Sequence, residues 1–107
     1  MAAIKIRVFC NAGMSTSMLV KKIQETAAKK GIDAEIAAFP YSEFDNKARE
    51  ADVVLLGPQI GYESANATAK LKDTKIPLAV IPMVDYGMMN GEKVLDFALN
   101  LKKQAQA

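Results

Sequence analysis

Apolar residues along this chain follow two alternating patterns, which predict strands and helices in turn. Short apolar runs are typical of strands, and apolar positions three and four residues apart are typical of amphipathic helices. The predicted strands are residues 4–9, 33–39, 53–56 and 78–81. The predicted helices are residues 15–30, 62–72 and 91–104, with a less regular helix or turn at 41–51. We expect residues 103–107 to form a frayed tail.

The alternation of strands and helices predicts a single α/β domain over residues 1–107. Short connections favour a four-stranded parallel sheet with helices on both faces, and we expect the strand order 2-1-3-4. The run 53–56 is apolar throughout, as in a strand covered on both faces. The first strand is also placed centrally in this order, although Lys5 and Arg7 alternate with its apolar residues, a pattern that by itself indicates a half-exposed strand.

The chain's only cysteine, Cys10, directly follows the first predicted strand. In a parallel sheet of this order, the loop after that strand lies in the crevice where the strand order reverses, a usual place for a binding site. Gly13 allows backbone N–H groups to converge, and Ser15, Thr16 and Ser17 add hydroxyl donors at the start of a helix. The unpaired N–H groups of that first turn favour a thiolate and a phosphoryl group attached to it.

Cys10 therefore has two interpretations. A lone cysteine is most often a small buried hydrophobic residue. Its position after a strand and before a helix, with a glycine and hydroxyl residues following, instead favours a nucleophile that becomes a phosphocysteine.

Composition excludes several other classes of protein. The net charge of +2 is small and the basic and acidic residues are well mixed, so nucleic acid is not an expected partner. No apolar run approaches the roughly 18 residues that cross a bilayer. Without histidine and with one cysteine, the chain offers no usual zinc ligand set, no phosphohistidine and no Cys-His protease pair. The first residues lack the apolar stretch of a secretory signal, so we expect a cytoplasmic protein.

Two further loops, residues 57–62 and 82–90, should reach the same end of the sheet as Cys10. Asp85 would repel a phosphorylated thiol and is not expected to be a ligand. Methionines in or beside these loops fill core gaps or offer an adaptable surface to partners. They are Met14, Met18, Met83, Met88 and Met89. The candidates for the rim of the site or for partner contact are Met18, Pro58, Gln59 and Tyr86.

Two segments, CNAGMSTS at 10–17 and ADVVLLGPQI at 51–60, closely resemble the IIB component of the lactose/cellobiose (chitobiose) class of the bacterial sugar phosphotransferase system. The resemblance covers essentially the whole chain. It implies a four-stranded parallel α/β fold, similar to that of the low-molecular-weight phosphatases. It also implies that Cys10 accepts a phosphoryl group from a histidine of a IIA protein, without a metal or other cofactor.

In this family the phosphoryl group then passes to a sugar held by the membrane-embedded IIC partner, typically a β-linked disaccharide or oligosaccharide. The resemblance therefore implies a cytoplasmic phosphotransferase that meets the membrane only through IIC. It also implies that the loop after the cysteine binds the phosphoryl group, mainly through backbone N–H groups. The candidate phosphate-binding residues are Asn11, Ala12, Gly13, Met14, Ser15, Thr16 and Ser17.

Two other functions are considered for this chain besides that of a phosphocarrier. A low-molecular-weight tyrosine phosphatase also places a cysteine after its first strand, but its phosphate loop needs an arginine where this chain has Thr16. Such an arginine grips the equatorial oxygens and stabilises charge during transfer to water. A regulatory interaction module is the second alternative, since similar domains occur within regulators. Neither the sugar nor the oligomeric state follows from the sequence.

Overall fold

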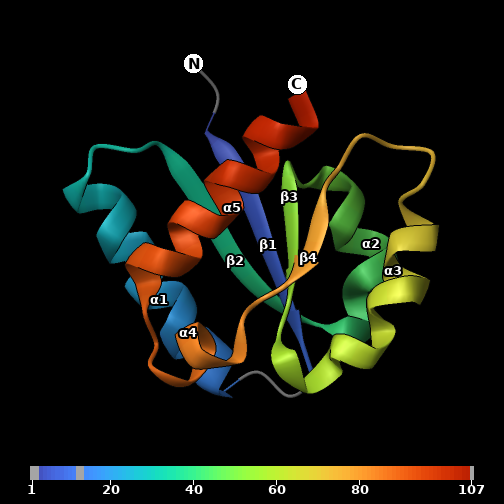
Figure 1. Ribbon diagram of the computed structural model, residues 1–107, viewed down its shortest axis with the longest axis horizontal. Coiled ribbons are helices and arrows are strands. Elements are labelled where there is room, and N and C mark those ends of the chain that lie inside the picture. Colours follow the sequence, from blue (N-terminus) through green and yellow to red (C-terminus); the bar gives the residue numbers. More distant parts are fainter. Residues whose placement is uncertain (1–2, 12–13, 107) are drawn as a thin grey trace.

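The fold is a four-stranded parallel sheet between two layers of helices (Figure 1). The computed structural model describes residues 3–11 and 14–106, without the side chains of residues 14, 15 and 106. The strands are β1 (Ile4–Cys10), β2 (Ala34–Pro40), β3 (Val53–Leu56) and β4 (Leu78–Val80). The α-helices are α1 (Met14–Lys29), α2 (Phe44–Lys47), α3 (Ser64–Lys70), α4 (Met83–Gly87) and α5 (Gly91–Gln106). Three 3₁₀ helices are η1 (Tyr41–Glu43), η2 (Ala48–Glu50) and η3 (Pro58–Glu63).

The predicted strand order is confirmed: the sheet runs β2-β1-β3-β4, with every pair parallel. β1 is central, and its last residues are in register with the ends of its neighbours. Cys10 lies opposite Pro40 of β2, and Phe9 lies opposite Leu56 of β3. The carboxyl ends of these strands therefore meet at one edge of the sheet, as the order predicts.

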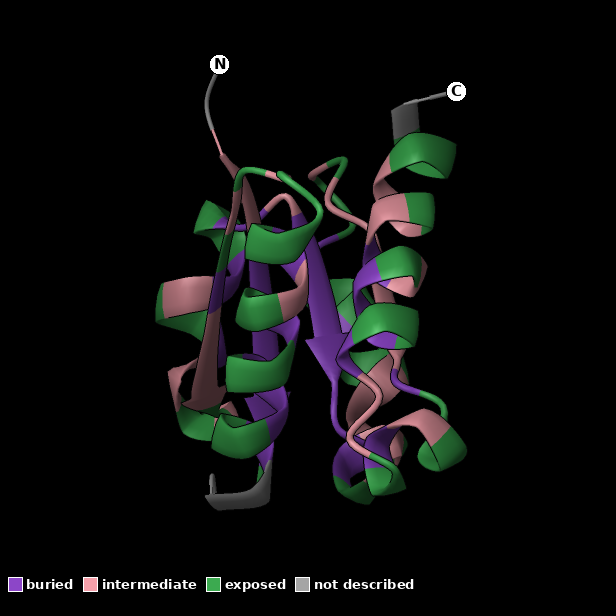
Figure 2. Ribbon diagram, turned by 90° about the vertical axis from the view of Figure 1, so that its left-hand side faces the viewer, coloured by how far each residue is buried: buried purple, intermediate pink, exposed green. Residues whose placement is uncertain are grey.

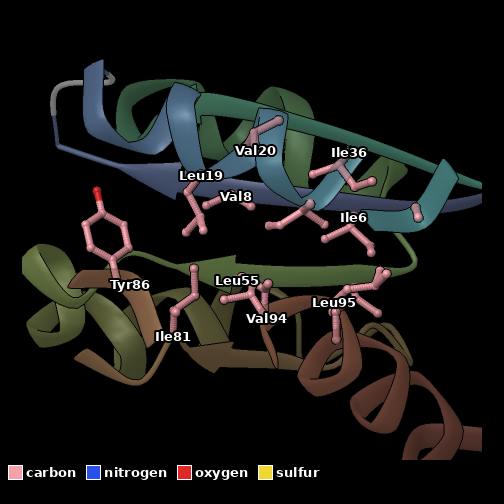
Figure 3. Packing of buried hydrophobic residues seen from close by; sticks show 14 residues of the cluster. Ile6, Val8, Leu19, Val20, Ile36, Leu55, Ile81, Tyr86, Val94 and Leu95 are labelled. Carbon is pink, nitrogen blue, oxygen red and sulfur yellow. The ribbon is translucent and has the colours of Figure 1, made fainter. Parts of the chain in front are cut away.

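Each face of the sheet is covered by its own apolar core. On one face, α1, α4 and α5 pack over β1 and β3 (Figure 3), and this core includes Ile6, Leu19, Leu55 and Leu95. On the other face, α2, α3 and the 3₁₀ helices cover a second core around Phe9. Coloured by burial, β3 is buried along its whole length between these layers (Figure 2). This agrees with its uniformly apolar sequence.

Arg7 explains how a strand with alternating charged residues lies at the centre of the sheet. Its side chain is only 4% exposed and lies on the same side as the second core. The guanidinium donates to the carboxylate of Glu35 in β2, approaches the carboxylate of Glu50 in η2 to 3.5 Å, and donates to the Glu35 carbonyl at 3.1 Å. These acceptors, distant in sequence, replace the water that the local pattern requires.

The boundaries of several elements differ from the prediction. The uncertain segment 41–51 forms η1, α2 and η2 in succession, and the helix predicted from residue 62 is α3, which begins at Ser64 and is preceded by η3. Pro58 at the first position of η3 is a typical helix start. The short helix α4 lies within a predicted loop. At the C-terminus, where we expected a frayed tail, α5 continues to Gln106, because Lys, Gln and Ala are good helix formers and no breaker follows Leu101.

Within residues 3–11 and 14–106, the helices are all too short or too polar to cross a membrane.

Candidate functional site

Cys10 is the last residue of β1, at the edge of the sheet where η3 and α4 also begin (Figure 1). Backbone hydrogen bonds join the segments at this edge. The N–H of Gly57, just after β3, donates to the carbonyl of Phe9 at 2.9 Å. The N–H of Ile81, just after β4, donates to the carbonyl of Leu56 at 2.9 Å. The loops that follow three neighbouring strands are therefore held in fixed positions around the end of β1.

The thiol of Cys10 is buried, with the residue only 2% exposed. Its Sγ lies 3.9 Å from the carbonyl oxygen of Phe39 in β2, to which the thiol can donate. On the other side it borders Gly57, where an added Cβ would lie 3.8 Å from the Cβ of Cys10. The next residue, Asn11, is exposed, so the chain passes from the thiol to the surface within one residue.

The first turn of α1 follows directly, since the helix begins at Met14, one residue before its predicted start. The N–H groups of residues 14–17 have no acceptors within the helix. None of these residues is acidic, so no carboxylate of this turn offsets the positive end of the helix dipole. The turn thus has the electrostatic character of an anion site.

The predicted phosphate-binding residues occupy different positions. Ala12 and Gly13 lie outside the described residues, as do the side chains of Met14 and Ser15. Asn11 and Ser17 are exposed. Thr16, in contrast, is fully buried, and its hydroxyl lies 2.8 Å from the Tyr86 hydroxyl. Helical spacing accounts for this, because residue 16 falls on the same face of α1 as Leu19, Val20, Ile23 and Ala27, all of which are buried.

The predicted rim residues also separate into two groups. Pro58 begins η3 and is half-buried, and Gln59 is exposed. The Oε1 of Gln59 would lie 2.9 Å from a Cβ added at Gly57, on the side of that glycine that also faces Cys10. The Gln59 amide oxygen and the Cβ of Cys10 therefore lie on the same side of Gly57. Tyr86 is 9% exposed and packs in the core beneath the rim instead of on it.

Exposed apolar side chains lie on α1, α4 and η3, near this edge of the sheet. Met18 is 58% exposed and borders a shallow hollow on α1, together with Lys21, Lys22 and Glu25. Met83, Val84 and Met88, on α4 and the turn after it, are more than 70% exposed, as is Tyr62. Met89 instead packs against the core. Val84 and Tyr62 were not among the residues predicted for partner contact. The i, i+4 spacing of residues 84 and 88 was the available signal for Val84.

Aromatic residues pack on the opposite face of the sheet, behind the end of β2. Phe44 lies 4.9 Å from Phe9 and 5.2 Å from Tyr41 between ring centroids, and the Lys70 ammonium lies 5.7 Å from the Tyr41 ring. Burial raises the pKa of Tyr41 above 10, and the negative charge of Glu63 raises it further. Tyr41 therefore keeps its proton at neutral pH, and its half-buried ring packs against the second core.

Comparisons with known proteins agree on one family. The model of the family "PTS system, Lactose/Cellobiose specific IIB subunit" matches residues 5–97. The chain is 44% identical over 106 residues to the galactose-specific EIIB component of Lactococcus lactis subsp. cremoris and to the cellobiose-specific EIIB component of L. lactis subsp. lactis, covering 94% of this chain and 98% of each relative. It is 39% identical over 97 residues to the oligo-beta-mannoside-specific EIIB component of Bacillus subtilis, covering 91% of this chain and 94% of that one.

Two solved structures share the fold. The cellobiose-specific IIB component of Borrelia burgdorferi is 39% identical, with a TM-score of 0.81 over 97% of this chain and 95% of that one. The lactose-specific IIB domain of Streptococcus pneumoniae is 18% identical, with a TM-score of 0.84 over 92% of this chain and 97% of that one. At that identity, the second likeness concerns the fold alone.

Proposed function

This chain belongs to the lactose/cellobiose-specific IIB family of sugar phosphotransferase systems, and on that premise we propose that Cys10 carries the phosphoryl group between a IIA protein and a sugar bound to IIC. Components of this family are phosphotransferases that serve sugar transport. The observation that carries the proposal is the position of Cys10: the only cysteine ends the central strand and is followed within four residues by the N-terminus of α1.

The transfer consists of two displacements at phosphorus. In the first, the Cys10 thiolate attacks the phosphohistidine of IIA, the S–P bond forms, the P–N bond breaks and the imidazole leaves. In the second, a hydroxyl oxygen of the sugar attacks phosphorus, the S–P bond breaks, the thiolate returns and the hydroxyl proton passes to a base of the IIC partner. Since this chain has no histidine, the N–H groups of the first turn of α1 supply the stabilisation of negative charge in both steps.

The phosphatase alternative is disfavoured by the environment of Thr16. This residue stands where the phosphatase loop needs an arginine, and its hydroxyl is directed into the core against Tyr86. It therefore supplies no bidentate grip on equatorial oxygens. A phosphocarrier benefits from this, because rapid transfer to water would discharge the phosphocysteine before the sugar arrives.

Partner contacts are proposed around the same edge. Met18, Met83, Val84 and Met88 expose apolar surface there, and a carrier that binds two partners in turn needs a small, adaptable surface. Two of the relatives are named for cellobiose and oligo-beta-mannosides, which supports a β-linked disaccharide or oligosaccharide as the sugar class, and the third is named for galactose, a monosaccharide. The carrier would then be cytoplasmic and reach the membrane through IIC, without inserting into it.

Intact-mass spectrometry tests the proposal. The wild type and a Cys10→Ala variant are incubated with phosphoenolpyruvate, the general relay proteins and the candidate IIA protein. We expect one phosphoryl adduct on the wild type, none on the variant, and loss of the adduct when membranes with IIC and the correct sugar are added. No adduct with an active IIA protein would refute the carrier. Hydrolysis of p-nitrophenyl phosphate that is abolished in Cys10→Ala would instead support the phosphatase.

A further inference from the structure

A buried hydrogen bond links the first turn of α1 to the short helix α4. The Thr16 hydroxyl lies 2.8 Å from the Tyr86 hydroxyl, across 70 positions of sequence. Thr16 is fully buried and Tyr86 is 9% exposed. Figure 3 shows the Tyr86 ring beside Leu19 and Ile81 at one end of the apolar core, with its hydroxyl directed away from Ile81 toward the layer of α1.

Apolar side chains could fill this position without a polar pair. A buried hydroxyl is tolerated only when its hydrogen bond is made, and a hydrogen bond fixes the distance and direction between its partners far more narrowly than apolar contact does. The two hydroxyls therefore set the position of the Thr16 side chain relative to α4. Thr16 is the third residue of α1, so the same contact sets the position of the first turn of that helix, whose N–H groups are the donors proposed for the phosphoryl group.

We propose that Tyr86 is a positioning residue for phosphoryl transfer: through Thr16, it holds the N-terminal turn of α1 in the orientation that the phosphoryl group on Cys10 requires. The proposal rests on the proposed function of Cys10. Tyr86 itself touches neither the phosphoryl group nor the partner, because its ring lies in the core. Its effect is geometric, since donors stabilise developing charge only at about 2.7–3.1 Å and a misplacement of about 1 Å costs on the order of 100-fold in rate.

α4 is otherwise poorly suited to hold anything in place. It is five residues long, its residues Met83 and Val84 are exposed, and so is Met88 directly after it. Tyr86 is its buried residue, and the Tyr86 N–H donates to the carbonyl of Pro82 at 3.0 Å. Among the side chains that the structure describes, Tyr86 is therefore the buried residue through which α4 reaches the first turn of α1.

The test compares variants that keep the shape of the pair with variants that keep its hydroxyl groups. Tyr86→Phe and Thr16→Val remove one hydroxyl each and keep the volume. Thr16→Ser keeps the hydroxyl and removes a methyl group. The measurement is the single-turnover rate of Cys10 phosphorylation against the concentration of phosphorylated IIA. Ile36→Val, in the same core but on β2, is the control for a loss of stability alone.

We expect Tyr86→Phe and Thr16→Val each to lower the maximal rate by about 10-fold or more, with the half-saturating IIA concentration little changed. The double variant should be no slower than the slower single variant, because each single substitution already breaks the same Thr16–Tyr86 hydrogen bond. Thr16→Ser should lose less rate than Thr16→Val. A packing role gives the opposite order, since Val conserves the volume and Ser leaves a hole. That opposite order, or single variants as fast as Ile36→Val, overturns the proposal.

Failure of the proposed function would be seen separately, as a wild type that accepts no phosphoryl group. In that case the proposal is tested by the rate of Cys10 alkylation by iodoacetamide, because the same helix turn favours the reactive thiolate form of Cys10. The rate constants should again decrease in the order wild type, Thr16→Ser, Thr16→Val. Equal rate constants in all three proteins would overturn the role of Tyr86 and Thr16 in positioning this turn.

Discussion

Gly91, the first residue of α5, permits a close contact between α1 and α5. A Cβ added at this position would lie 2.7 Å from both the carbonyl carbon and the oxygen of Lys22, and 3.0 Å from the nitrogen of Ile23. Ordinary contact begins at 3.4 Å, so the shortfall is about 0.7 Å. All three atoms belong to the backbone of α1 and cannot rotate away. In a Gly91→Ala variant the helices must therefore separate, which loosens the core around Ile23 and Leu95.

The expected effect has the opposite sign from that of an ordinary helical Gly→Ala change. Overpacking costs about 1–3 kcal/mol. The gain in helix propensity offsets at most about 0.5–1 kcal/mol, and less at a first helical residue. We expect a net loss of about 1–2 kcal/mol, equivalent to a lower Tm by about 5–15 °C, in thermal and urea unfolding followed by circular dichroism. Gly87 in α4, with no atom within 4 Å of its added Cβ, is the matched control and should lose no stability as Gly87→Ala. A Gly91→Ala variant as stable as the wild type would refute the close contact.

Three further predictions concern the ion pair of Arg7, the buried volume of its side chain, and the space beside Gly57. Arg7 lowers the Glu35 pKa below 4.5, so this ion pair stabilises the fold above about pH 4.5, and the contribution is lost as pH falls through the folded pKa. The urea midpoint should therefore fall more steeply between pH 7 and pH 3 for the wild type than for Glu35→Gln. Equal slopes in the two proteins would contradict the pairing. Arg7→Met should change the free energy of unfolding by less than about 1 kcal/mol, because it replaces a buried charge with an apolar chain of similar length. Arg7→Ala should instead lower the free energy of unfolding by about 2–4 kcal/mol, because it leaves a cavity. Equal losses for the two variants in urea titrations would show that the charge matters more than the volume. Gly57→Ala should fold normally but displace the Gln59 side chain from its place beside Gly57, and it should slow single-turnover phosphorylation as much as Gln59→Ala does. Wild-type rates in both variants would exclude Gln59 from the site.

The architecture was predictable because local apolar patterns in the sequence identify the strands and the helices between them. The apolar run Val53–Leu56 indicates a strand covered on both faces, and the alternation of strands and helices then leaves few topologies. Once the order is set, the carboxyl end of β1 and Cys10 fall at the crevice. What local signals could not supply are partners from distant strands and helices. The burial of Arg7 depends on the carboxylates of Glu35 and Glu50, each more than 25 positions away in the sequence.

In the segment after Cys10 too, local sequence signals predict some features, and contacts with distant residues determine the others. Its hydroxyl residues were predicted to add donors to those of the backbone, but a helix turns about 100° per residue, so adjacent side chains cannot all face one ligand. Ser17 is exposed and Thr16 is buried. Helical spacing with Leu19 and Ile23 was enough to predict that burial. The contact with Tyr86 was not predictable, because it belongs to a five-residue helix too short to show a period. The Thr16 hydroxyl is therefore directed into the core, and we propose the backbone N–H groups of this turn as the main donors to a phosphoryl group, in a position that the Thr16 side chain helps to fix.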